Sequence, residues 1–423
     1  MPDRAWTRSY KWFRPGLGVK RWLVVLAVGI ILIGIGVGAL VCQVASLSLT
    51  EGLLHLGFLP PWALILLPVT AGAGVVIFGL RGLNRTLLSP FTEGNGEIVE
   101  ALYRYRRRGR GPKVVAIGGG HGLSALLRGL KAYTSNITAI VTVADDGGSS
   151  GRLRRALGVL PPGDFRNCIA ALADDEALIT QLFQYRFPAV EDEAGLGGHS
   201  FGNLFITAMM EVTGSFERAI LESSRVLAVQ GCVVPSTLES VTLLGDLRAE
   251  PATISRVAGE SQITESHGAI ARVYLDPGDP PAYPGAVRAI LEADLIVAGP
   301  GSLYTSVLPN MLVREIAQAI DASRAARVYV CNVATERGET DGYSVGDHMT
   351  ALESHVGPGL FGIVLANDNF EAAATLPSGV EPVRLEVPPN VVYTLHTVDL
   401  VDADRPWRHD SERLAKVLVQ LVE

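Results

Sequence analysis

KVVAIGGGHG, residues 113–122, is followed by LSALLRGLKAY, residues 123–133. The β-branched run Lys113–Ile117 predicts a short buried strand, and leucines at helical spacing predict a helix after it. Strand, glycine turn and helix open many nucleotide-binding α/β folds, because glycine lets the backbone approach a phosphate and the helix N-terminus directs free N–H groups at it. The spacing differs from the dinucleotide fingerprint, since Leu123 stands where the third glycine would fall, and no P-loop Lys follows. A tight packing turn is the alternative for this stretch alone.

A second strand and polar loop follow directly. Ile137–Ala144 predicts a buried strand, and it runs into Asp145, Asp146 and the loop GGSSGR at residues 147–152. An acid at this position can bond a ribose hydroxyl, hold Mg²⁺ or accept a proton from a substrate hydroxyl. The loop offers backbone donors, hydroxyls and one guanidinium, which suit a phosphate. A capped surface turn is the competing interpretation.

Four further segments place polar groups among glycines or prolines. They are PPGDFRN at residues 161–167, GHSFGN at 198–203, GPGSLYTS at 299–306 and TERGETDGY at 335–343, and the last two follow predicted strands at Leu295–Ala298 and Arg327–Asn332. Ligands of such sheets bind at the carboxyl ends of strands, so together the segments predict a large polar cleft. His199 and His348 are the nearest histidines, and a structural role is the more common one for a single histidine. The sequence contains no GxSxG or HExxH motif and no metal-spaced Cys/His set, which argues against a hydrolase with a ready nucleophile.

Length and composition favour a protein with one part in lipid. The chain has 423 residues, 48% of them hydrophobic and only 19% charged, and length alone predicts two or three domains. Its four cysteines lie far apart and form no CxxC pair, so a disulfide framework or a cysteine-rich zinc site is excluded. Two uncharged apolar runs, at about residues 22–45 and 62–80, are near the ~20 residues that a membrane-spanning helix needs.

Charge predicts the orientation of this hairpin. Arg14, Lys20 and Arg21 precede the first run, basic residues follow the second, and the loop at about residues 46–61 has no Lys or Arg. Both ends of the hairpin and all that follows are therefore predicted to face the cytoplasm. Residues 1–111 carry a balance of +8 and the rest −15, so the body lacks the basic composition of a nucleic-acid-binding protein. The Arg104–Arg110 cluster is best interpreted as a contact with anionic headgroups.

Seven strings resemble one family. IGGGHGLSALLRGLK, ITAIVTVADDGGSSGRLR, PPGDFRNCIAAL, LFQYRF, GHSFGNLF, AGPGSLYTSVLPN and CNVATERGETDGYSVGDH, spread from Lys113 to about Asn367, resemble the YvcK/CofD-like family and its gluconeogenesis-factor (YvcK-type) branch. The resemblance implies a Rossmann-like α/β fold. It also implies a bacterial regulatory protein that binds UDP-sugars such as UDP-N-acetylglucosamine, is associated with growth on gluconeogenic carbon, and is linked to cell shape and wall synthesis. The other branch transfers a phospholactyl group from a guanylyl diphosphate donor to a deazaflavin, with Mg²⁺.

Two departures from the family pattern stand out. His121 occupies a position where many members carry Thr, so imidazole replaces a hydroxyl. The hairpin is absent from the shorter members, so their soluble behaviour does not carry over. After about residue 367 no motif is transferred, and the stretch Glu412–Val422 predicts only an amphipathic helix packed on the body.

The predicted organisation has three parts: a membrane hairpin at residues 1–88, a basic juxtamembrane linker at 89–111, and at 112–423 a Rossmann-like, doubly wound, mostly parallel α/β domain that binds a nucleotide sugar. The leading hypothesis is a membrane-tethered cytoplasmic regulator, with no catalytic residue assigned. The alternative is a phospholactyl transferase in which Asp145 or Asp146 holds Mg²⁺ or activates the acceptor hydroxyl. Nucleic acid is not expected as a partner, self-association is left open, and protein partners in wall synthesis are not identified. The predicted ligand-binding residues are Gly118, Gly119, Gly120, His121, Gly122, Asp145, Asp146, Gly147, Gly148, Ser149, Ser150, Arg152, Asp164, Arg166, Asn167, His199, Ser200, Asn203, Gly301, Ser302, Tyr304 and Thr305.

Overall fold

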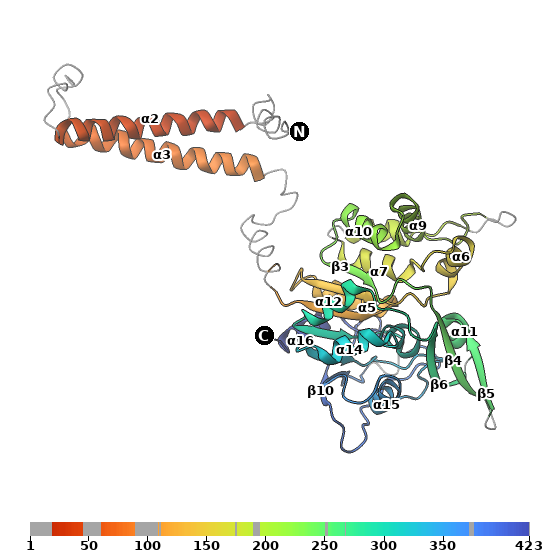
Figure 1. Ribbon diagram of the computed structural model, residues 1–423. Coiled ribbons are helices and arrows are strands. Elements are labelled where there is room, and N and C mark those ends of the chain that lie inside the picture. Colours follow the sequence, from red (N-terminus) through yellow and green to blue (C-terminus); the bar gives the residue numbers. More distant parts are fainter. Residues whose placement is uncertain are drawn as a thin grey trace. The chain divides into compact units, whose positions relative to one another are not determined.

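The structure, a computed structural model, divides into two compact units, residues 1–104 and 105–423 (Figure 1). It describes residues 19–44, 61–88, 109, 111–173, 176–188, 195–249, 253–266, 268–371 and 376–422. The loop predicted at about residues 46–61 and the linker predicted at 89–111, with its arginine cluster, lie almost entirely outside the described residues.

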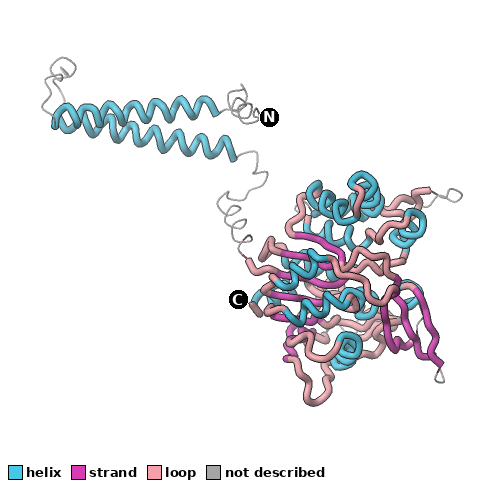
Figure 2. The backbone as a smooth tube through the Cα atoms, viewed as in Figure 1, coloured by secondary structure: helices cyan, strands magenta, loops and turns pink. Residues whose placement is uncertain are grey.

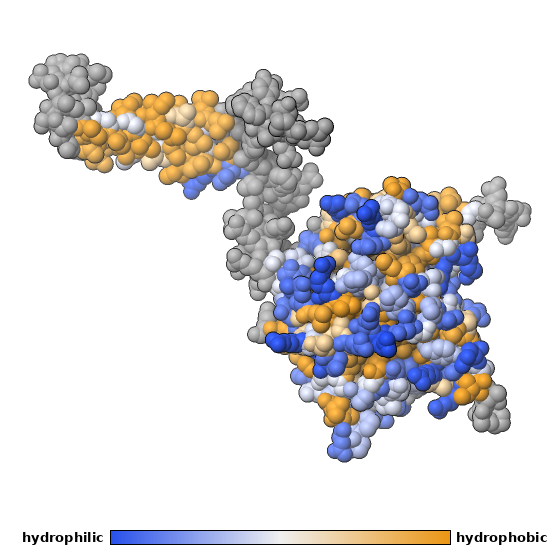
Figure 3. Space-filling model, in the orientation of Figure 1, coloured by the Kyte–Doolittle hydropathy of each residue, from blue (hydrophilic) through white to orange (hydrophobic). Residues whose placement is uncertain are grey.

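Two long apolar helices make up the described part of the first unit. They are α2, Val19–Val44, and α3, Pro61–Leu88, and they contain the two predicted apolar runs. Both helices are long and apolar enough to cross a membrane by length and composition. Their side chains point outward to an unusual degree, since Val24 and Ile30 are each 63% exposed and Phe78 is also 63% exposed. Apolar residues cover the visible face of both helices (Figure 3). In water such a surface would be unfavourable, whereas lipid would cover it.

Glycines let α2 and α3 approach closely in an antiparallel pair. A Cβ added at Gly29 would lie 2.7 Å from Val76 Cγ2, and one added at Gly72 would lie 2.7 Å from the Gly29 carbonyl oxygen. A Cβ added at Gly36 would likewise lie 2.6 Å from Val69 Cγ2. Small residues at the contact are typical of helices that associate by close backbone packing in membranes.

A parallel seven-stranded sheet forms the centre of the second unit, called the body below. Its strands lie in the order β10-β9-β8-β7-β1-β2-β3, and every pair is parallel. The central strands are uninterrupted runs of Val, Ile, Ala and Leu because helices cover both faces. The strands are β1, Val114–Gly118; β2, Ile137–Val141; β3, Cys232–Pro235; β7, Leu295–Ala298; β8, Ala326–Val330; β9, Ile363–Asn367; and β10, Thr394–Val398.

The helices of the body flank this sheet (Figure 1). Helix α5 packs against α7 and α16, and α12 packs against α14. The helices are α5, Gly120–Leu130; α6, Gly148–Leu157; α7, Gly163–Leu172; α8, Glu176–Gln184; α9, Phe201–Thr213; α10, Phe216–Val226; α11, Glu260–Glu265; α12, Pro284–Leu291; a π-helical turn, Leu303–Val307; α13, Leu308–Met311; α14, Arg314–Ala322; α15, Val345–Val356; and α16, Ser411–Gln420. The predicted C-terminal helix is α16, and it packs on the body as expected.

A separate antiparallel sheet was not predicted from the sequence. Strands β4, Thr242–Ala249; β5, Thr253–Ala258; and β6, Ala269–Asp276, lie in the order β5-β4-β6, with α11 between β5 and β6 in the chain (Figure 2).

The strand order reverses between β1 and β7. The chain runs outward from β1 to β2 and β3, then returns to β7 on the other side of β1 and runs outward again to β8, β9 and β10. Loops that leave β1 and β7 must therefore separate, and a crevice opens at the carboxyl ends of these two strands. This arrangement confirms the predicted doubly wound α/β fold. The chain enters the sheet at the opposite, amino-terminal edge, where Pro112 and Val422 line the same hollow.

Candidate functional site

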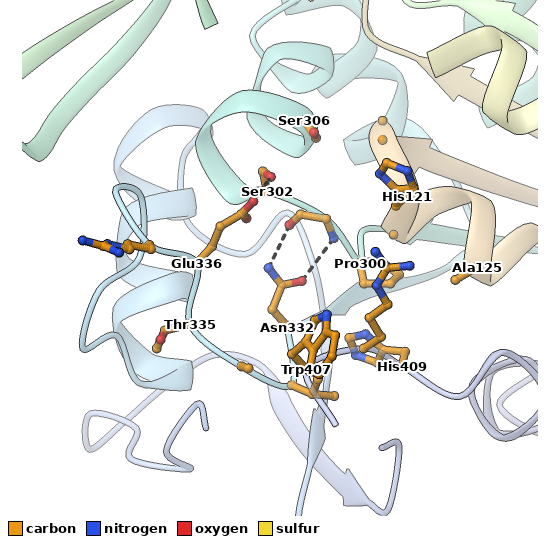
Figure 4. A pocket seen from close by; sticks show the side chains of 18 of the residues that line it. His121, Ala125, Pro300, Ser302, Ser306, Asn332, Thr335, Glu336, Trp407 and His409 are labelled. Carbon is orange, nitrogen blue, oxygen red and sulfur yellow. Dashed lines mark hydrogen bonds between the residues drawn. The ribbon is translucent and has the colours of Figure 1, made fainter. Parts of the chain in front are cut away.

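A cavity of about 640 Å³ occupies the crevice at the reversal of strand order. Its walls come from loops and helices that follow six of the seven parallel strands, so residues from 119 to 409 contribute. The predicted site residues that line it are Gly119, Gly120, His121, Gly122, Asp145, Asp164, Asn167, Gly301 and Ser302. The further lining residues are Ala125, Glu260, Pro300, Ser306, Asn332, Val333, Ala334, Thr335, Glu336, Arg337, Pro377, Val380, Trp407, Arg408 and His409 (Figure 4).

The turn between β1 and α5 requires its glycines for two reasons. Gly120 has φ of +63°, a conformation that favours glycine, whereas Gly119 is extended and is constrained only by its neighbours. A Cβ at Gly119 would overlap Asp164 Oδ2, and one at Gly122 would overlap the carbonyl oxygen of Pro300. Gly119 itself has no side chain to cap α5, and the carboxyl group of Asp164 accepts a hydrogen bond from the N–H of Gly120, the first residue of the helix. The turn therefore brings the positive end of an eleven-residue helix to the cavity wall.

The turn after β7 is held by an asparagine that sequence reasoning did not select. Asn332 Oδ1 accepts a hydrogen bond from the Gly301 N–H at 3.1 Å, and its Nδ2 donates to the Gly301 carbonyl at 3.1 Å (Figure 4). Gly301 has φ of +151°, so this pair of bonds fixes a backbone that other residues rarely adopt. The side chain of Asn332 thus orders the wall between β7 and β8.

Three carboxyl groups meet on the β2 side of the cavity: Asp145 after β2, Asp164 in α7 and Glu260 at the start of α11. Burial, then the charge of Asp145, raises the pKa of Asp164 to about 7, although a hydrogen bond from the Gly120 N–H opposes the rise. Burial and the nearby Asp145 and Asp164 raise the pKa of Glu260 to about 10. Glu260 is thus protonated at neutral pH, and this acidic cluster carries less negative charge than three carboxylates would.

Asp146 lies outside the cavity lining, although it adjoins Asp145 in the sequence. Its Oδ1 accepts hydrogen bonds from Ser261 N at 3.0 Å and from Ser261 Oγ at 2.7 Å. Gly259 has φ of +105°, and a Cβ there would overlap Asp146 Oδ2. Asp146 therefore fastens the start of α11 to the end of β2, and in doing so it helps to place Glu260 on the cavity wall.

The serines of the second glycine loop belong to a buried network beside the cavity. Ser149 Oγ and His199 Nδ1 lie 3.0 Å apart, and Asn203 Nδ2 donates to Ser149 Oγ at 3.1 Å and approaches Ser150 Oγ at 3.5 Å. Ser200 caps α9 by accepting from the Asn203 N–H at 3.4 Å. These contacts join the start of α6 to the start of α9. The partial exposure of Gly147 and the exposure of Gly148 leave that end of α6 accessible.

Two arginines extend this network. Arg166, which is 5% exposed, donates to Asn167 Oδ1 at 2.9 Å, and Gln184 Nε2 donates to the same oxygen at 2.8 Å. Burial and the charge of Arg186 lower the pKa of Arg166 to about 10, which still leaves it protonated. Arg152 donates to the Gly197 carbonyl at 2.9 Å. Asn167 lines the cavity, so this network supports one cavity wall from behind.

The remaining predicted residues also act from behind the cavity wall. Thr305 Oγ1 donates to Glu339 Oε1 at 2.7 Å, and the Tyr304 N–H donates to Glu339 Oε2 at 3.3 Å. Burial and the charge of Glu336 raise the pKa of Glu339 to about 7. Gly118 is the last residue of β1, and its carbonyl accepts from Asn310 Nδ2 at 3.0 Å.

Burial lowers the pKa of both His121 and His348. Burial, followed by the charges of Arg408, Arg166 and Arg128, lowers the pKa of His121, which lines the cavity. His348 is fully buried with Nδ1 2.8 Å from the Ser344 carbonyl, and it does not line the cavity, in keeping with a structural role.

The wall on the β8 side contains residues that sequence reasoning missed. His409 is buried, its Nε2 lies 3.2 Å from the Cys331 carbonyl, and burial lowers its pKa to about 4. This bond places the Trp407–His409 segment over the end of β8. The sequence gives only a weak signal for this segment, because Trp-Arg-His stands between a proline and a helix cap and contains no glycine.

Within the described residues, no group of three or more His, Cys, Asp or Glu side chains is arranged to hold a metal ion. Asp145 and Asp164 nevertheless offer the hard oxygen atoms that Mg²⁺ prefers, and Mg²⁺ commonly binds one or two carboxylates together with substrate phosphates. The cavity therefore fits Mg²⁺ only in company with a phosphorylated ligand.

Comparison with known proteins places the chain in one family. A family model described as 2-phospho-L-lactate transferase CofD matches residues 114–420. A putative gluconeogenesis factor from Nostoc sp. is 47% identical over 437 residues, which cover 97% of this chain and 92% of its own. A gluconeogenesis factor from Bacillus subtilis is 44% identical over 329 residues, which cover 74% of this chain and 99% of its own.

A crystal structure shows the same fold in a further relative. A UPF0052-family protein from Bacillus halodurans superposes with a TM-score of 0.66 at 44% identity, and it covers 73% of this chain and 99% of its own. The body thus corresponds to a complete folded protein in these shorter relatives, whereas the Nostoc relative also matches the N-terminal unit. With a family model spanning the body and relatives this similar over most of their length, the chain belongs to the YvcK/CofD family, in the branch of the gluconeogenesis factors.

Proposed function

We propose that this gluconeogenesis-factor homologue is a regulatory protein, held at the cytoplasmic face of the membrane by α2 and α3, that binds a UDP-sugar such as UDP-N-acetylglucosamine. Through that ligand it would connect the use of gluconeogenic carbon with cell shape and cell-wall synthesis. The names of the relatives support the link to gluconeogenesis. The outward-facing apolar side chains of α2 and α3 support the membrane attachment.

One observation carries the ligand proposal: the cavity at the strand reversal combines features that a nucleotide diphosphate needs. The N-terminus of α5 attracts negative charge, and Gly119, Gly120 and Gly122 present backbone rather than side chains to the cavity. Arg408 adds a guanidinium to the same wall. A volume of about 640 Å³ lies within the range of small-molecule sites.

Isothermal titration calorimetry with UDP-N-acetylglucosamine tests the proposal. Gly119→Ala introduces a Cβ against Asp164 Oδ2 at a φ that any residue adopts, so the backbone survives while the phosphate wall changes. Affinity should fall at least tenfold, about 1.4 kcal/mol. Gly362→Ala is the matched control, because nothing lies within 4 Å of its added Cβ. Failure of the wild type to bind any UDP-sugar would overturn the proposal.

The transferase is the second candidate function, and two observations favour it. The matching family model is described as a 2-phospho-L-lactate transferase, and Asp145 and Asp164 face the cavity together. When bound, Mg²⁺ would neutralise the phosphate charge, and Asp145 and Asp164 are the residues that would hold it. In this role the acidic cluster would also accept the proton of the acceptor hydroxyl.

Incubation with guanylyl phospholactate, a deazaflavin and Mg²⁺ separates the two functions. The regulator yields no product with these substrates. If product forms with Mg²⁺ and is lost in the Asp145→Asn variant, the transferase hypothesis would replace the regulator hypothesis.

A further inference from the structure

The cavity has chemically different ends along the strand order. On the β8 side it is lined by the apolar side chains of Val333, Val380 and Trp407 together with the polar Thr335, Glu336 and Arg337, and on the β2 side by the carboxyl groups of Asp145 and Glu260. The glycine turns that follow β1 and β7 lie between these ends. A ring that stacks on Trp407 with polar groups at its edge suits the β8 side, a group that accepts hydrogen bonds from N–H groups suits the middle, and hydroxyl groups suit the β2 side.

Trp407 is the main apolar feature of the β8 side. Its side chain is 41% exposed although it lines a cavity, which Asn332 and His409 also line (Figure 4). The segment that carries it is fixed, because buried His409 is bonded to the Cys331 carbonyl at 3.2 Å. A large aromatic ring on a fixed backbone offers a planar surface on which another ring can stack, and stacking of a base on an aromatic side chain contributes about 1–3 kcal/mol.

The middle of the cavity is the place for the diphosphate. Gly120 and Gly122 bring the first turn of α5 to the cavity surface, where Asp164 accepts a hydrogen bond from the Gly120 N–H. Arg408, the residue after Trp407, is near enough to His121 in that turn to lower its pKa. The guanidinium and the helix N-terminus thus act on the same region, next to the tryptophan.

The geometry points to one orientation of the nucleotide sugar: the nucleobase stacks on Trp407, the diphosphate lies at the N-terminus of α5, and the sugar hydroxyls meet Asp145 on the β2 side. This inference rests on the proposed function, since it specifies how a UDP-sugar occupies the cavity. It gives Trp407 the role of a specificity-determining residue for the nucleotide end of the ligand. The opposite orientation would place the sugar, in place of the nucleobase, against the ring of Trp407.

Intrinsic fluorescence of the full-length protein in detergent measures contact with this ring. Trp407 is the only tryptophan in residues 105–423, and the other four are at positions 6, 12, 22 and 62. Titration with UDP-N-acetylglucosamine, UDP or UMP should change the emission of the wild type. Free N-acetylglucosamine should not change it. Trp407→Leu should abolish the change, because the remaining tryptophans lie outside the body.

Calorimetry then identifies which end of the ligand the ring contacts. Trp407→Leu should lower the affinity for UDP and for UDP-N-acetylglucosamine by the same factor, about 5- to 150-fold. Trp407→Phe, which keeps an aromatic face, should lose less. Asp145→Asn should weaken binding of the UDP-sugar but not of UDP. Phe370→Leu, a substitution at a 39% exposed aromatic residue outside the cavity, should leave both affinities unchanged.

Two outcomes would overturn the orientation. If Trp407→Leu weakened UDP-N-acetylglucosamine but left UDP unaffected, the ring would contact the sugar. If Trp407→Leu weakened neither ligand, the ring would contact no part of it. Failure of the proposed function is distinguishable from both, because then the wild type itself binds neither UDP nor the UDP-sugar.

Discussion

Asp164→Asn should stabilise the body, and the gain should increase with pH. Asp164 is fully buried beside Asp145, and these surroundings raise its pKa from 3.8 to about 7. Asparagine has nearly the same shape, carries no charge and still accepts a hydrogen bond from the Gly120 N–H. The substitution thus removes a carboxyl group whose ionised form the fold disfavours.

The sign and the size follow from the two pKa values. Between pH 3.8 and about 7 the native state holds a proton at Asp164 that the unfolded chain has lost, so the free energy of unfolding falls as pH rises through this window and levels off above it. The cost of the carboxyl group is about 1.5 kcal/mol at pH 5 and about 4 kcal/mol at pH 8. The advantage of Asp164→Asn should therefore grow by about 2.5 kcal/mol between these two pH values.

Urea unfolding of residues 105–423 at pH 5 and pH 8, with EDTA present, measures this difference. Glu260→Gln tests the same reasoning at a second carboxyl group: its pKa is raised from 4.5 to about 10, so the native state keeps a proton that the unfolded chain loses, and the advantage of the amide should also grow between pH 5 and pH 8. Gly362→Ala is the control, because it removes no titratable group and nothing lies within 4 Å of its added Cβ, so it should produce no such pH dependence. An Asp164→Asn variant whose stability relative to wild type is the same at both pH values would refute the reasoning.

Three other predictions concern packing, capping and topology. Gly129→Ala places a Cβ on the carbonyl oxygen of Ser411 at the start of α16, so it should lower the free energy of unfolding by about 1–3 kcal/mol in urea, whereas Gly362→Ala should be near neutral. Asp146→Ala removes the acceptor of two hydrogen bonds from Ser261 and should lower the free energy of unfolding by about 1–2 kcal/mol in the same assay. An unchanged urea midpoint would mean that these bonds do not stabilise the start of α11. A reporter fused after residue 423 of the full-length chain should be active only in the cytoplasm, because the loop at 46–61 has no Lys or Arg, and activity outside the cell would contradict the predicted orientation.

The central strands were predictable because their signal is local. Lys113–Ile117 was expected as a strand, and the structure has Val114–Gly118; Leu295–Ala298 was predicted with its observed bounds. Each is a short run of buried β-branched or aliphatic residues that ends in glycine, and parallel strands covered on both faces require that composition. The crevice followed from the same pattern, since loops at carboxyl ends of parallel strands share one edge.

The acidic cluster shows what local patterns cannot supply. Asp145 and Asp146 are adjacent in the sequence and were interpreted as a pair, but only Asp145 lines the cavity, whereas Asp146 is bonded to Ser261 at the start of α11. Its neighbours there, Asp164 and Glu260, come from α7 and α11. Glu260 depends on the antiparallel sheet of β4, β5 and β6, whose pairing was not foreseen and is set by contacts distant in sequence.

The β8 wall was missed for a related reason. Trp407 and Arg408 lie between β10 and α16, more than 280 residues after Gly119, and no glycine turn marks them. They reach the cavity because the neighbouring His409 contacts the carbonyl of Cys331 at the end of β8. A single sequence carries no sign of such a return.

Both ends of the body leave from the edge of the sheet that is remote from the cavity, where Pro112 and Val422 line one hollow. Additions to either terminus can therefore be exchanged without obstructing the ligand's entrance. A lineage could gain or lose a membrane anchor in this way as a modular change, with the same body working in bulk cytoplasm or at a surface. The same geometry makes either terminus a suitable point for immobilising the protein on a sensor chip, with the cavity left facing the flow.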